Sequence, residues 1–421
     1  MLHKIYNFAW HIAPPIIKHY LRKRAQKNPE YSNHWGERFG EPHPNPVQRA
    51  IWLHAVSVGE TRAAQPLITQ LKQHFPNAPI LLTQMTPTGR ATAQTLFPEA
   101  QCRYLPYDNP QWVQQFIREH RPIFGVLMET EIWANLIQEC KRENVPLFLA
   151  NARLSEKSQQ GYQKIQSFIA PALGKLSGCY AQTAEDAARL QTIGAVPPVV
   201  CGNTKYDIAI PEQSIELATQ FREKIGKRRV FLAASLREKN GVDEAELILR
   251  AWQYFRQPED LLILVPRHPE RFQAACDLVQ QFDLTIQKRS DNQAVQPETA
   301  VWVGDSMGEM WAYYQVADVV FVGGSLVDTG CQNIIEPMTC GKPVLFGQSV
   351  YNFQAACDGA LRFGAAKQIA DVNELLQTVR QWLDNPEDYA AITTQARQFV
   401  AQHQGASARI AQQIIDKLKA S

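Results

Sequence analysis

The strongest constraint on the fold is a pattern in which short apolar runs alternate with longer helical stretches, twice along the chain. From residue 50, the apolar runs are AIWLHA, APILLTQ, CRYLPY, IFGVLME, PLFLAN, CYAQT and PVVCGN. The pattern lapses through PEQSIELATQFREKIGKRR and resumes with VFLAAS, LLILVPRH, LTIQKR, AVWVGD, DVVFVGG and PVLFG. Such alternation is typical of parallel sheets covered by helices on both faces. The sequence therefore predicts two doubly wound α/β domains.

The length supports this division, because a chain of 421 residues, 45% of them hydrophobic, is longer than a single hydrophobic core usually accommodates. We expect an amino-terminal membrane-associating segment, a first Rossmann-like domain, a linker, a second Rossmann-like domain and a C-terminal helix that could pack on the first domain. Their predicted ranges are 1–40, 41–210, 211–225, 226–395 and 396–421.

Charge and cysteine content limit the classes of partner and compartment. The formal net charge of +2 disfavours a general nucleic-acid-binding surface. The eight cysteines form no CxxC motif, which indicates a reducing compartment. The amino terminus lacks a clean apolar region with a small-residue cleavage site, so we expect no signal peptide.

The first stretch, MLHKIYNFAWHIAPPIIKHYLRKRAQKNP, combines basic, aromatic and aliphatic residues and contains no acidic residue. Its uncharged part is too short and too polar for an ordinary bilayer span. We expect an amphipathic helix in the interface of an anionic membrane, against the alternative of a surface helix packed on the body. The expected contacts are Tyr6, Trp10 and Tyr20 at headgroup level, with Lys18, Arg22, Lys23, Arg24 and Lys27 facing the lipid.

In the first half, three motifs follow apolar runs at the strand ends where ligands of parallel sheets gather. HAVSVGE places Glu60 on a short loop at the start of a helix. METEIW offers Glu129 and Glu131, which could orient a sugar hydroxyl, stabilise positive charge or, less favourably, hold a divalent ion. GNTKYD places Lys205 near the predicted junction, where it could meet a phosphate or be a solvated lysine.

The second half contains neither GxGxxG nor GxxxxGK[ST], which disfavours dehydrogenase and kinase functions. Its stretch FVGGSLVDTGCQNIIEPMTCGKPVLFG has a glycine pair that would let a ligand approach the backbone. The following helix would attract a phosphate and would carry Asn333 and Glu336 on one face, with Glu336 suited to ribose hydroxyls or simply to solvent. PRHPER forms a basic turn suited to an anion, and GDSMGEM could approach a base or cap a helix.

These motifs, in this order and together with NARLS (151–155) and WGERFG (35–40), resemble those of 3-deoxy-D-manno-octulosonic acid (Kdo) transferases of lipopolysaccharide synthesis. The resemblance implies a GT-B glycosyltransferase, with two Rossmann-like domains facing a central cleft. It implies transfer of Kdo from CMP-Kdo to the tetraacylated lipid A precursor, lipid IVA. It also implies a peripheral or monotopic location on the cytoplasmic face of the inner membrane.

The same resemblance implies the roles of individual residues. Glu60 would be the general base, and Glu129, favoured over Glu131, would stabilise the transition state with Lys205. The residues that would bind CMP-Kdo are Arg267, His268, Gly308, Glu309, Met310, Ser325, Asn333, Ile334, Ile335 and Glu336. No metal or other cofactor is expected.

The chain departs from the family pattern where a Gly-Gly-His-Asn loop is common, because it reads Gly330-Cys331-Gln332-Asn333. Gln332 cannot carry charge, so an ionic role at this position is in doubt. Two alternatives stay open: a GT-B enzyme using a UDP-sugar, such as an epimerase or N-acetylglucosamine transferase, and a membrane-associated nucleotide-binding adaptor without turnover. We expect Glu60 to be ionised at neutral pH, a weak base whose benefit lies in its position.

Overall fold

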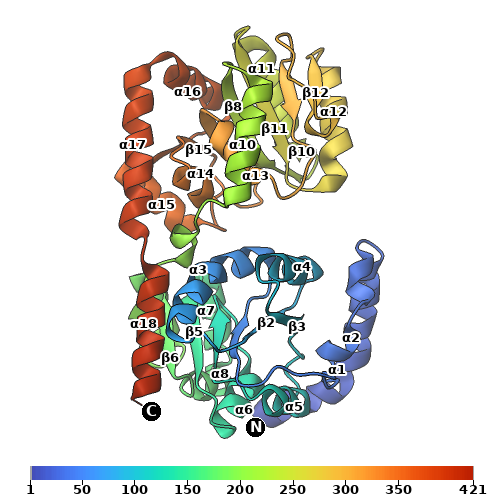
Figure 1. The fold of residues 1–421 in the computed structure, drawn as a ribbon, viewed down its shortest axis with the longest axis vertical. Helices are drawn as coiled ribbons and strands as arrows, with labels where there is room; N and C mark the ends of the chain where they lie inside the picture. Colours follow the sequence, from blue (N-terminus) through green and yellow to red (C-terminus); the bar gives the residue numbers. More distant parts are fainter. Residues whose placement is uncertain (1, 421) are drawn as a thin grey trace. The chain divides into compact units, whose positions relative to one another are not determined.

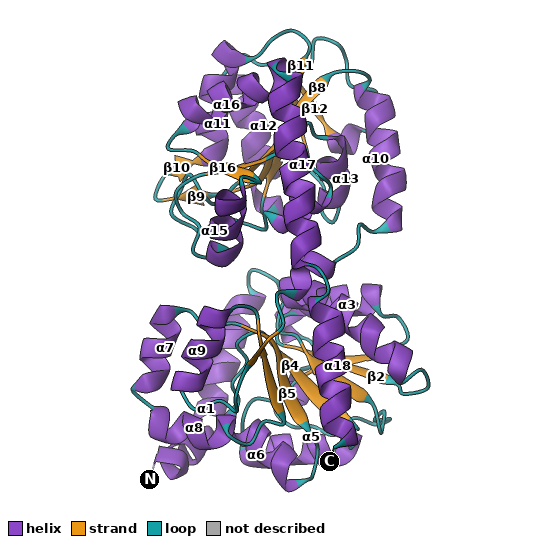
Figure 2. Ribbon diagram, turned by 90° about the vertical axis from the view of Figure 1, so that its left-hand side faces the viewer, coloured by secondary structure: helices purple, strands orange, loops and turns teal. Residues whose placement is uncertain are grey.

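The computed structural model describes residues 2–420 and divides into two compact units. Unit 1 comprises the chain up to Ile208 together with the stretch from Gln404 onward, and unit 2 comprises Ala209–His403. Each unit contains one parallel seven-stranded sheet with helices on both faces (Figures 1 and 2). This confirms the predicted pair of doubly wound α/β domains.

The sheet of unit 1 has the strand order β3-β2-β1-β4-β5-β6-β7. Its strands are β1 (Ile51–His54), β2 (Ile80–Gln84), β3 (Gln101–Tyr104), β4 (Phe124–Met128), β5 (Leu147–Ala152), β6 (Gly178–Ala181) and β7 (Val199–Val200). The central strands are buried on both faces, with Trp52 in the core on one side and Ile51 and Leu53 in the core on the other. Because β1 lies between β2 and β4, the strand order reverses there, and this is where ligands of such sheets bind.

The helices of unit 1 connect these strands. They are α3 (Val58–His74), α4 (Pro87–Leu96), α5 (Pro110–His120), α6 (Ala134–Arg142), α7 (Glu156–Gln163), α8 (Gln166–Leu173), α9 (Ala184–Thr192) and the 3₁₀ turn η2 (Thr204–Asp207). The last helix, α18 (Ala406–Lys419), packs beside α3 and completes the core with Ile410, Ala411 and Ile414 (Figure 1). Asp207 accepts hydrogen bonds from the backbone of Gly405 and Ser407 and fixes the start of this helix.

The amino-terminal segment folds as α1 (Leu2–Ala25), η1 (Pro29–Ser32) and α2 (Trp35–Arg38). The exposed side of α1 carries a stripe of large apolar residues: Leu2, Ile5, Phe8, Ile12, Ile16 and Tyr20. The other side packs on the rest of unit 1, where Tyr6 donates to Asp108 at 2.9 Å and its ring contacts that of Phe168 in a tilted arrangement. Trp10 contacts Tyr107. Tyr6 and Trp10, which we expected at headgroup level, therefore hold the helix to the protein instead.

The basic residues of α1 lie on the surface, and three of them also contact aromatic rings. Lys18 lies over Phe39, Arg22 over Trp35 and Arg24 over Tyr31. Across residues 2–420, no helix combines the length and the apolar character that crossing a membrane requires.

The sheet of unit 2 has the order β12-β13-β11-β8-β14-β15-β16. Its strands are β8 (Arg229–Leu236), β11 (Asp260–Pro266), β12 (Ile286–Lys288), β13 (Val301–Val303), β14 (Val319–Val322), β15 (Val344–Phe346) and β16 (Ala366–Gln368). Strand order reverses between β8 and β14, which gives unit 2 its own switch point. A small antiparallel hairpin of β9 (Glu238–Lys239) and β10 (Val242–Asp243), absent from our predictions, follows β8.

The helices of unit 2 are α10 (Glu212–Ile225), α11 (Glu244–Phe255), η3 (Pro269–Arg271), α12 (Phe272–Gln281), η4 (Arg289–Asp291), α13 (Met310–Val316), α14 (Ile335–Thr339), α15 (Gln354–Phe363), α16 (Val372–Asp384) and α17 (Pro386–His403). The stretch 211–225, which we expected to be a linker, supplies α10. This helix packs on α13 because Ala218, Phe221 and Ile225 are buried. The division of the chain falls earlier, after Ile208, and α17 extends unit 2 as far as His403.

Candidate active site

Three glutamates lie at the switch point of unit 1, where β1 and β4 end side by side. Glu60 is in the first turn of α3, directly after the loop that leaves β1. Glu129 and Glu131 belong to the loop that leaves β4. The charges of Glu129 and Glu131 both raise the pKa of Glu60, so the three carboxylates form one electrostatic group. The sequence predicted each position separately, and the parallel pairing of β1 with β4 brings them together.

The carboxylate of Glu60 is held by its own loop. Its Oε2 accepts a hydrogen bond from the backbone N–H of Val56 at 2.8 Å, and its Oε1 accepts one from the Ser57 hydroxyl at 3.2 Å. Burial, followed by the nearby charge of Glu129, raises the pKa of Glu60 to about 7. We expected Glu60 to be an ordinarily ionised, weak base. This expectation is wrong, because burial outweighs the helix terminus and the two hydrogen bonds and makes Glu60 a stronger base than an ordinary carboxylate.

Glu129 lies between two cations in a strained backbone position. Its φ of 56° is in the left-handed region, which is uncommon for a residue other than glycine and is found at functional sites. Oε1 accepts from Lys205 Nζ at 2.7 Å, and Oε2 lies 3.1 Å from Arg153 Nε. Burial alone would raise the pKa of Glu129, but Lys205 and Arg153 outweigh it and hold the pKa below its ordinary value.

Glu131 has different partners. Its Oε2 accepts from the indole of Trp133 at 2.6 Å and lies 3.8 Å from Nε2 of the fully buried His54. These two residues outweigh burial and lower the pKa of Glu131. Glu131 is thus paired with His54 and Trp133, whereas Glu129 pairs directly with Lys205, the lysine that we expected to act with it.

Arg153 and His54 are contacts of this site that our sequence reasoning did not assign. Both had a signal in the sequence, because NARLS begins with the last two residues of β5, the strand beside β4, and HAVSVGE begins with the last residue of β1. Asn151 also connects the site, since its Oδ1 accepts from the backbone of Thr204 at 3.0 Å and anchors the turn that carries Lys205. The resulting group contains anionic and cationic side chains at fixed distances, suited to proton transfer and to stabilising charge.

In unit 2, the RHPER turn places Arg267 and His268 on the surface at the end of β11. Arg267 Nε donates to Oε1 of Gln332 at 3.3 Å, so the residue that departs from the family pattern still makes a polar contact here. Although both residues reach the surface, the surrounding protein removes part of their hydration, and this desolvation, followed by the charge of Arg237, lowers the pKa of both Arg267 and His268. Arg237, Arg267 and His268 thus form a basic group, and a bound anion would reduce the repulsion between their charges.

The GDSMGEM loop after β13 divides into an open and a paired part. Gly308 adopts a φ of 83°, and open space surrounds the position where a side chain would begin. Glu309 makes two contacts with Arg289, of 3.0 and 3.1 Å, and also accepts from Ser306. Met310, at the start of α13, is partly buried. Gly308 and Met310 remain able to approach a ligand, whereas Glu309 already has an internal cation.

The glycine-rich stretch after β14 differs from our expectation in two ways. Ser325 is 1% exposed, and its hydroxyl donates to the carbonyl of Val322 and accepts from the backbone of Gly347. Ile334 and Ile335 are fully buried in the core. Asn333 precedes the short helix α14, and its Oδ1 accepts from the backbone N–H of Ile335, the first residue of that helix, at 3.0 Å. We expected Asn333 and Glu336 on one helical face, but only Glu336, which is partly buried, lies within α14.

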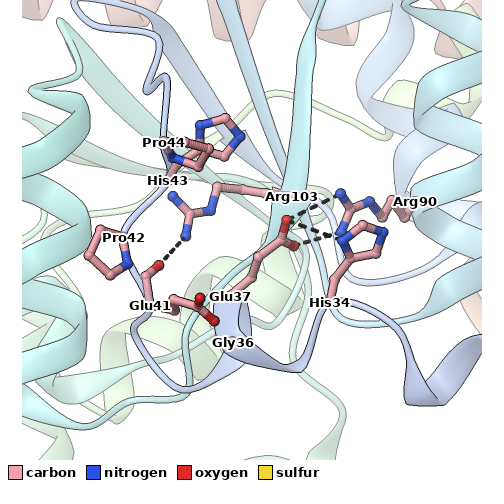
Figure 3. Close-up of a pocket in the computed structure, with 9 residues that line it drawn as sticks. All are labelled: His34, Gly36, Glu37, Glu41, Pro42, His43, Pro44, Arg90 and Arg103. Carbon is pink, nitrogen blue, oxygen red and sulfur yellow. Dashed lines mark hydrogen bonds and ion pairs between the residues drawn. The ribbon is translucent and has the colours of Figure 1, made fainter.

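A separate pocket of about 340 Å³ lies in unit 1 beside α2 and the edge strand β3 (Figure 3). Three of its charged side chains are paired: Glu37 and Arg90 with each other at 2.6 Å, and Arg103 with Glu119 at 2.9 Å. Glu37 also accepts from the backbone of Tyr104 at 2.8 Å. The WGERFG stretch thus joins the amino-terminal segment to the sheet, and the pocket contains none of the predicted site residues.

Comparisons with known proteins match both units. Residues 33–208 match the family described as 3-deoxy-D-manno-octulosonic-acid transferase (kdotransferase), and residues 218–399 match glycosyl transferases group 1. A 3-deoxy-D-manno-octulosonic acid transferase of Bordetella pertussis is 37% identical over 96% of this chain and 97% of that protein. One from Haemophilus influenzae is 36% identical over 81% of each.

Solved structures show similarity at the level of the fold. The UDP-GlcNAc 2-epimerase of Neisseria meningitidis has a TM-score of 0.59 at 14% identity, covering 88% of this chain and 100% of that chain. Another UDP-N-acetylglucosamine 2-epimerase has a TM-score of 0.61 at 11% identity, covering 90% and 98%. At these identities the two share an architecture with this chain, which does not establish a common substrate.

Proposed function

The chain belongs to the 3-deoxy-D-manno-octulosonic acid (Kdo) transferase family of glycosyltransferases, and on that premise we propose that Glu60 is the general base of Kdo transfer from CMP-Kdo to lipid IVA. Kdo transfer in lipopolysaccharide biosynthesis follows from the family itself. The observation that supports the choice of base is the partly buried Glu60 carboxylate, held by Val56 and Ser57, with a pKa of about 7. A base is most effective when its pKa lies near the working pH.

In the proposed reaction, Glu60 accepts the proton of a lipid IVA hydroxyl as the oxygen of that hydroxyl attacks the anomeric carbon of Kdo. The bond between this carbon and the phosphate oxygen of CMP breaks, and CMP leaves with the electron pair. Attack opposite to the leaving group inverts the anomeric centre. The reacting carbon gains positive character during the step, which nearby carboxylates stabilise.

We assign transition-state stabilisation to Glu129 and Lys205. Their 2.7 Å contact and the second cation, Arg153, keep Glu129 ionised while Glu60 exchanges its proton. A fixed anion beside Glu60 also raises the affinity of Glu60 for a proton, which strengthens it as a base. Lys205 carries the positive charge that suits a departing phosphate or a substrate carboxylate.

We propose that unit 2 binds CMP-Kdo. The supporting residues are Arg267, His268, Gly308, Met310 and Glu336, which are exposed or partly buried around the carboxyl ends of its strands. Ser325, Ile334 and Ile335 would contribute through the backbone that they shape, because their side chains are buried. Asn333 would act by holding the start of α14, and Glu309 by holding Arg289.

We propose peripheral binding of α1 to the anionic cytoplasmic face of the inner membrane. The exposed apolar stripe from Leu2 to Tyr20 is what an interfacial helix presents to lipid, and exposed basic residues from Lys18 to Lys27 accompany it. This arrangement would bring the protein to an acceptor that resides in the same membrane.

The direct test supplies the full-length protein with lipid IVA vesicles and either CMP-Kdo or UDP-N-acetylglucosamine, with product detection by mass spectrometry. We expect lipid products that have gained one or more Kdo units, from CMP-Kdo alone. Turnover of the UDP-sugar without Kdo transfer would support the epimerase or N-acetylglucosamine transferase alternative. Tight nucleotide binding without any turnover would support the adaptor alternative.

A further inference from the structure

The glycine-rich loop of unit 2, residues 323–327, binds a carboxylate of the same chain. Glu244, the first residue of α11, is fully buried, and its carboxylate accepts from the backbone N–H groups of Gly324, Ser325 and Leu326 at 2.7, 3.0 and 2.9 Å. It also accepts from the backbone of Arg237 at 2.8 Å. The backbone N–H of Val327 donates to the same carboxylate at 3.5 Å. Five amide donors to one carboxylate make a set of charge-assisted hydrogen bonds, the stronger kind.

The glycines of the loop are explained by this internal anion. A side chain at position 323 would begin 2.8 Å from Oε2 of Glu244, so only glycine leaves room for the carboxylate. Gly324 has a φ of 78°, the left-handed conformation that turns its N–H toward Glu244. The sequence pattern that we took for a direct approach of ligand to backbone is therefore used by Glu244.

The place of this cluster in the sheet relates it to the predicted donor site. Glu244 follows β8, and the loop follows β14, so the carboxylate and the amides meet at the switch point of unit 2. The backbone of Gln332 donates to the carbonyl of Gly323 at 3.1 Å, and the side chain of Gln332 accepts from Arg267. Through Gln332, the loop is therefore connected to Arg267, which we predict to contact the nucleotide.

A second contact fixes the same loop from the hairpin side. Lys239, in β9, pairs with the exposed Asp328 at 2.8 Å. Arg271, in the RHPER turn, pairs with Glu238 at 2.7 Å and with Asp243. The hairpin thus connects the RHPER turn to the glycine-rich loop, and Glu244 lies directly after its last strand.

We propose that Glu244 is a positioning residue for the donor: its carboxylate keeps the 323–327 loop in the shape that receives the nucleotide of CMP-Kdo. This inference rests on the proposed donor site. Glu244 contacts no substrate in this role, since its amide partners enclose it. The nucleotide instead meets the outer surface of a loop that is already ordered, which lowers the conformational cost of binding.

The test compares wild type with Glu244→Gln, which keeps the side-chain size but replaces one acceptor oxygen by an NH₂ group that cannot accept the N–H bonds. Titration calorimetry measures CMP binding to the full chain, and steady-state kinetics measures KM for CMP-Kdo and for the acceptor. We expect Kd for CMP and KM for CMP-Kdo to rise about tenfold or more. We expect KM for the acceptor and kcat to change less than about threefold.

The matched control is Asp260→Asn, because Asp260 is a buried carboxylate of the same unit at the opposite, amino end of β11. Asp260 is 1% exposed and is held by Arg229, Arg380 and the backbone of Gln257. We expect this substitution to lower the stability of the protein and to leave KM for CMP-Kdo unchanged. A general loss of packing in unit 2 would affect both variants alike, whereas a positioning role affects only the first.

Glu244→Asp provides a second measurement if the glutamine variant folds poorly. It keeps the charge on a shorter side chain, and we expect donor affinity between those of wild type and Glu244→Gln. Unchanged CMP affinity in folded Glu244 variants would overturn the inference. Tighter CMP binding would overturn it too, since the carboxylate would then be a competitor of the ligand. A wild-type chain that binds no CMP would overturn the proposed donor, and this inference with it.

Discussion

At the scale of the residue, the three carboxylates of the site have different surroundings, which shift their pKa values in different directions. Burial and the neighbouring anions raise the pKa of Glu60 to about 7, whereas cations beside Glu129, and His54 and Trp133 beside Glu131, lower theirs. Groups whose environments push their pKa values apart can take different chemical roles. These shifts support the proposed roles, in which Glu60 exchanges the proton and Glu129 keeps its charge.

This difference predicts opposite effects on stability. Because the pKa of Glu60 is higher in the folded state than its ordinary value of 4.5, the stability that it contributes is present below that value and is lost as pH rises through about 7. Glu60→Gln stays neutral and avoids that loss. We expect the variant to be more stable than wild type at pH 8, by up to about 3 kcal/mol, and similar to wild type near pH 4. Urea unfolding at the two pH values measures both differences.

Glu131→Gln serves as the comparison for that experiment. Since the folded state lowers the pKa of Glu131, its contribution to stability is present above its ordinary pKa and is lost as pH falls through the folded value. The glutamine variant should therefore be less stable than wild type at pH 8. The same direction of change in both variants would show that their pKa shifts do not govern stability.

The positions of Glu60, Glu129 and Lys205 could be predicted from the sequence because each follows an apolar run that becomes a strand end. Their partners could not, because contacts such as Arg153 with Glu129 depend on which strands become neighbours in the sheet. The strength of Glu60 as a base was also out of reach, since burial depends on the packing of several loops. The position of a residue at the end of a strand follows from the nearby sequence, whereas its electrostatic environment depends on residues that are distant in the sequence.

At the scale of the element, α1 packs on the body of the protein, which was one of the two alternatives that its composition left open, and it also exposes the apolar side that the proposed membrane binding requires. It packs on unit 1 through residues such as Tyr6 and Leu21, and it exposes apolar side chains on the other side. Composition indicated an amphipathic helix but could not assign its two sides, because aromatic residues suit both a protein core and a membrane interface. Tyr6 and Trp10 serve the protein side.

Polar substitution of the exposed stripe should therefore weaken membrane binding without unfolding the protein. We expect replacement of Ile5, Phe8, Ile12 and Ile16 by serine to reduce association with anionic vesicles about tenfold or more, because each apolar side chain contributes to interfacial burial. Vesicle flotation measures the effect. Tyr254→Ser is the control, since Tyr254 is 81% exposed but lies on α11 of unit 2. Equal flotation of the serine variant and wild type would refute binding through this stripe.

The glycine-rich loop, residues 323–327, shows what a sequence pattern can and cannot predict about an element. Its glycines correctly indicated a close approach to the backbone, but the approaching group is Glu244 of the same chain. A sequence pattern shows that space is required without showing what occupies that space. Glu244 lies far from the loop in the sequence, so only the pairing of β8 with β14 reveals the contact.

At the scale of the whole molecule, the two-unit architecture was predictable because the central strands of both sheets are buried on both faces and read as continuous apolar runs. The boundaries were harder to predict. Helix α10 has the polar composition of a linker but buries Phe221, and α18 returns to unit 1 after α17 has extended unit 2. The proposed division of labour gives the base to unit 1 and the nucleotide to unit 2.

The central claim is that Kdo transfer depends on proton uptake by Glu60, and the pH dependence of kcat/KM tests it most directly. For wild type we predict a rate that rises with pH through an apparent pKa of about 7, because only the ionised carboxylate accepts a proton. Folded Glu60→Gln should lose about 10²- to 10⁴-fold in rate and lack this rise. A variant that keeps more than about a tenth of wild-type activity, with the same rise near neutral pH, would contradict the claim.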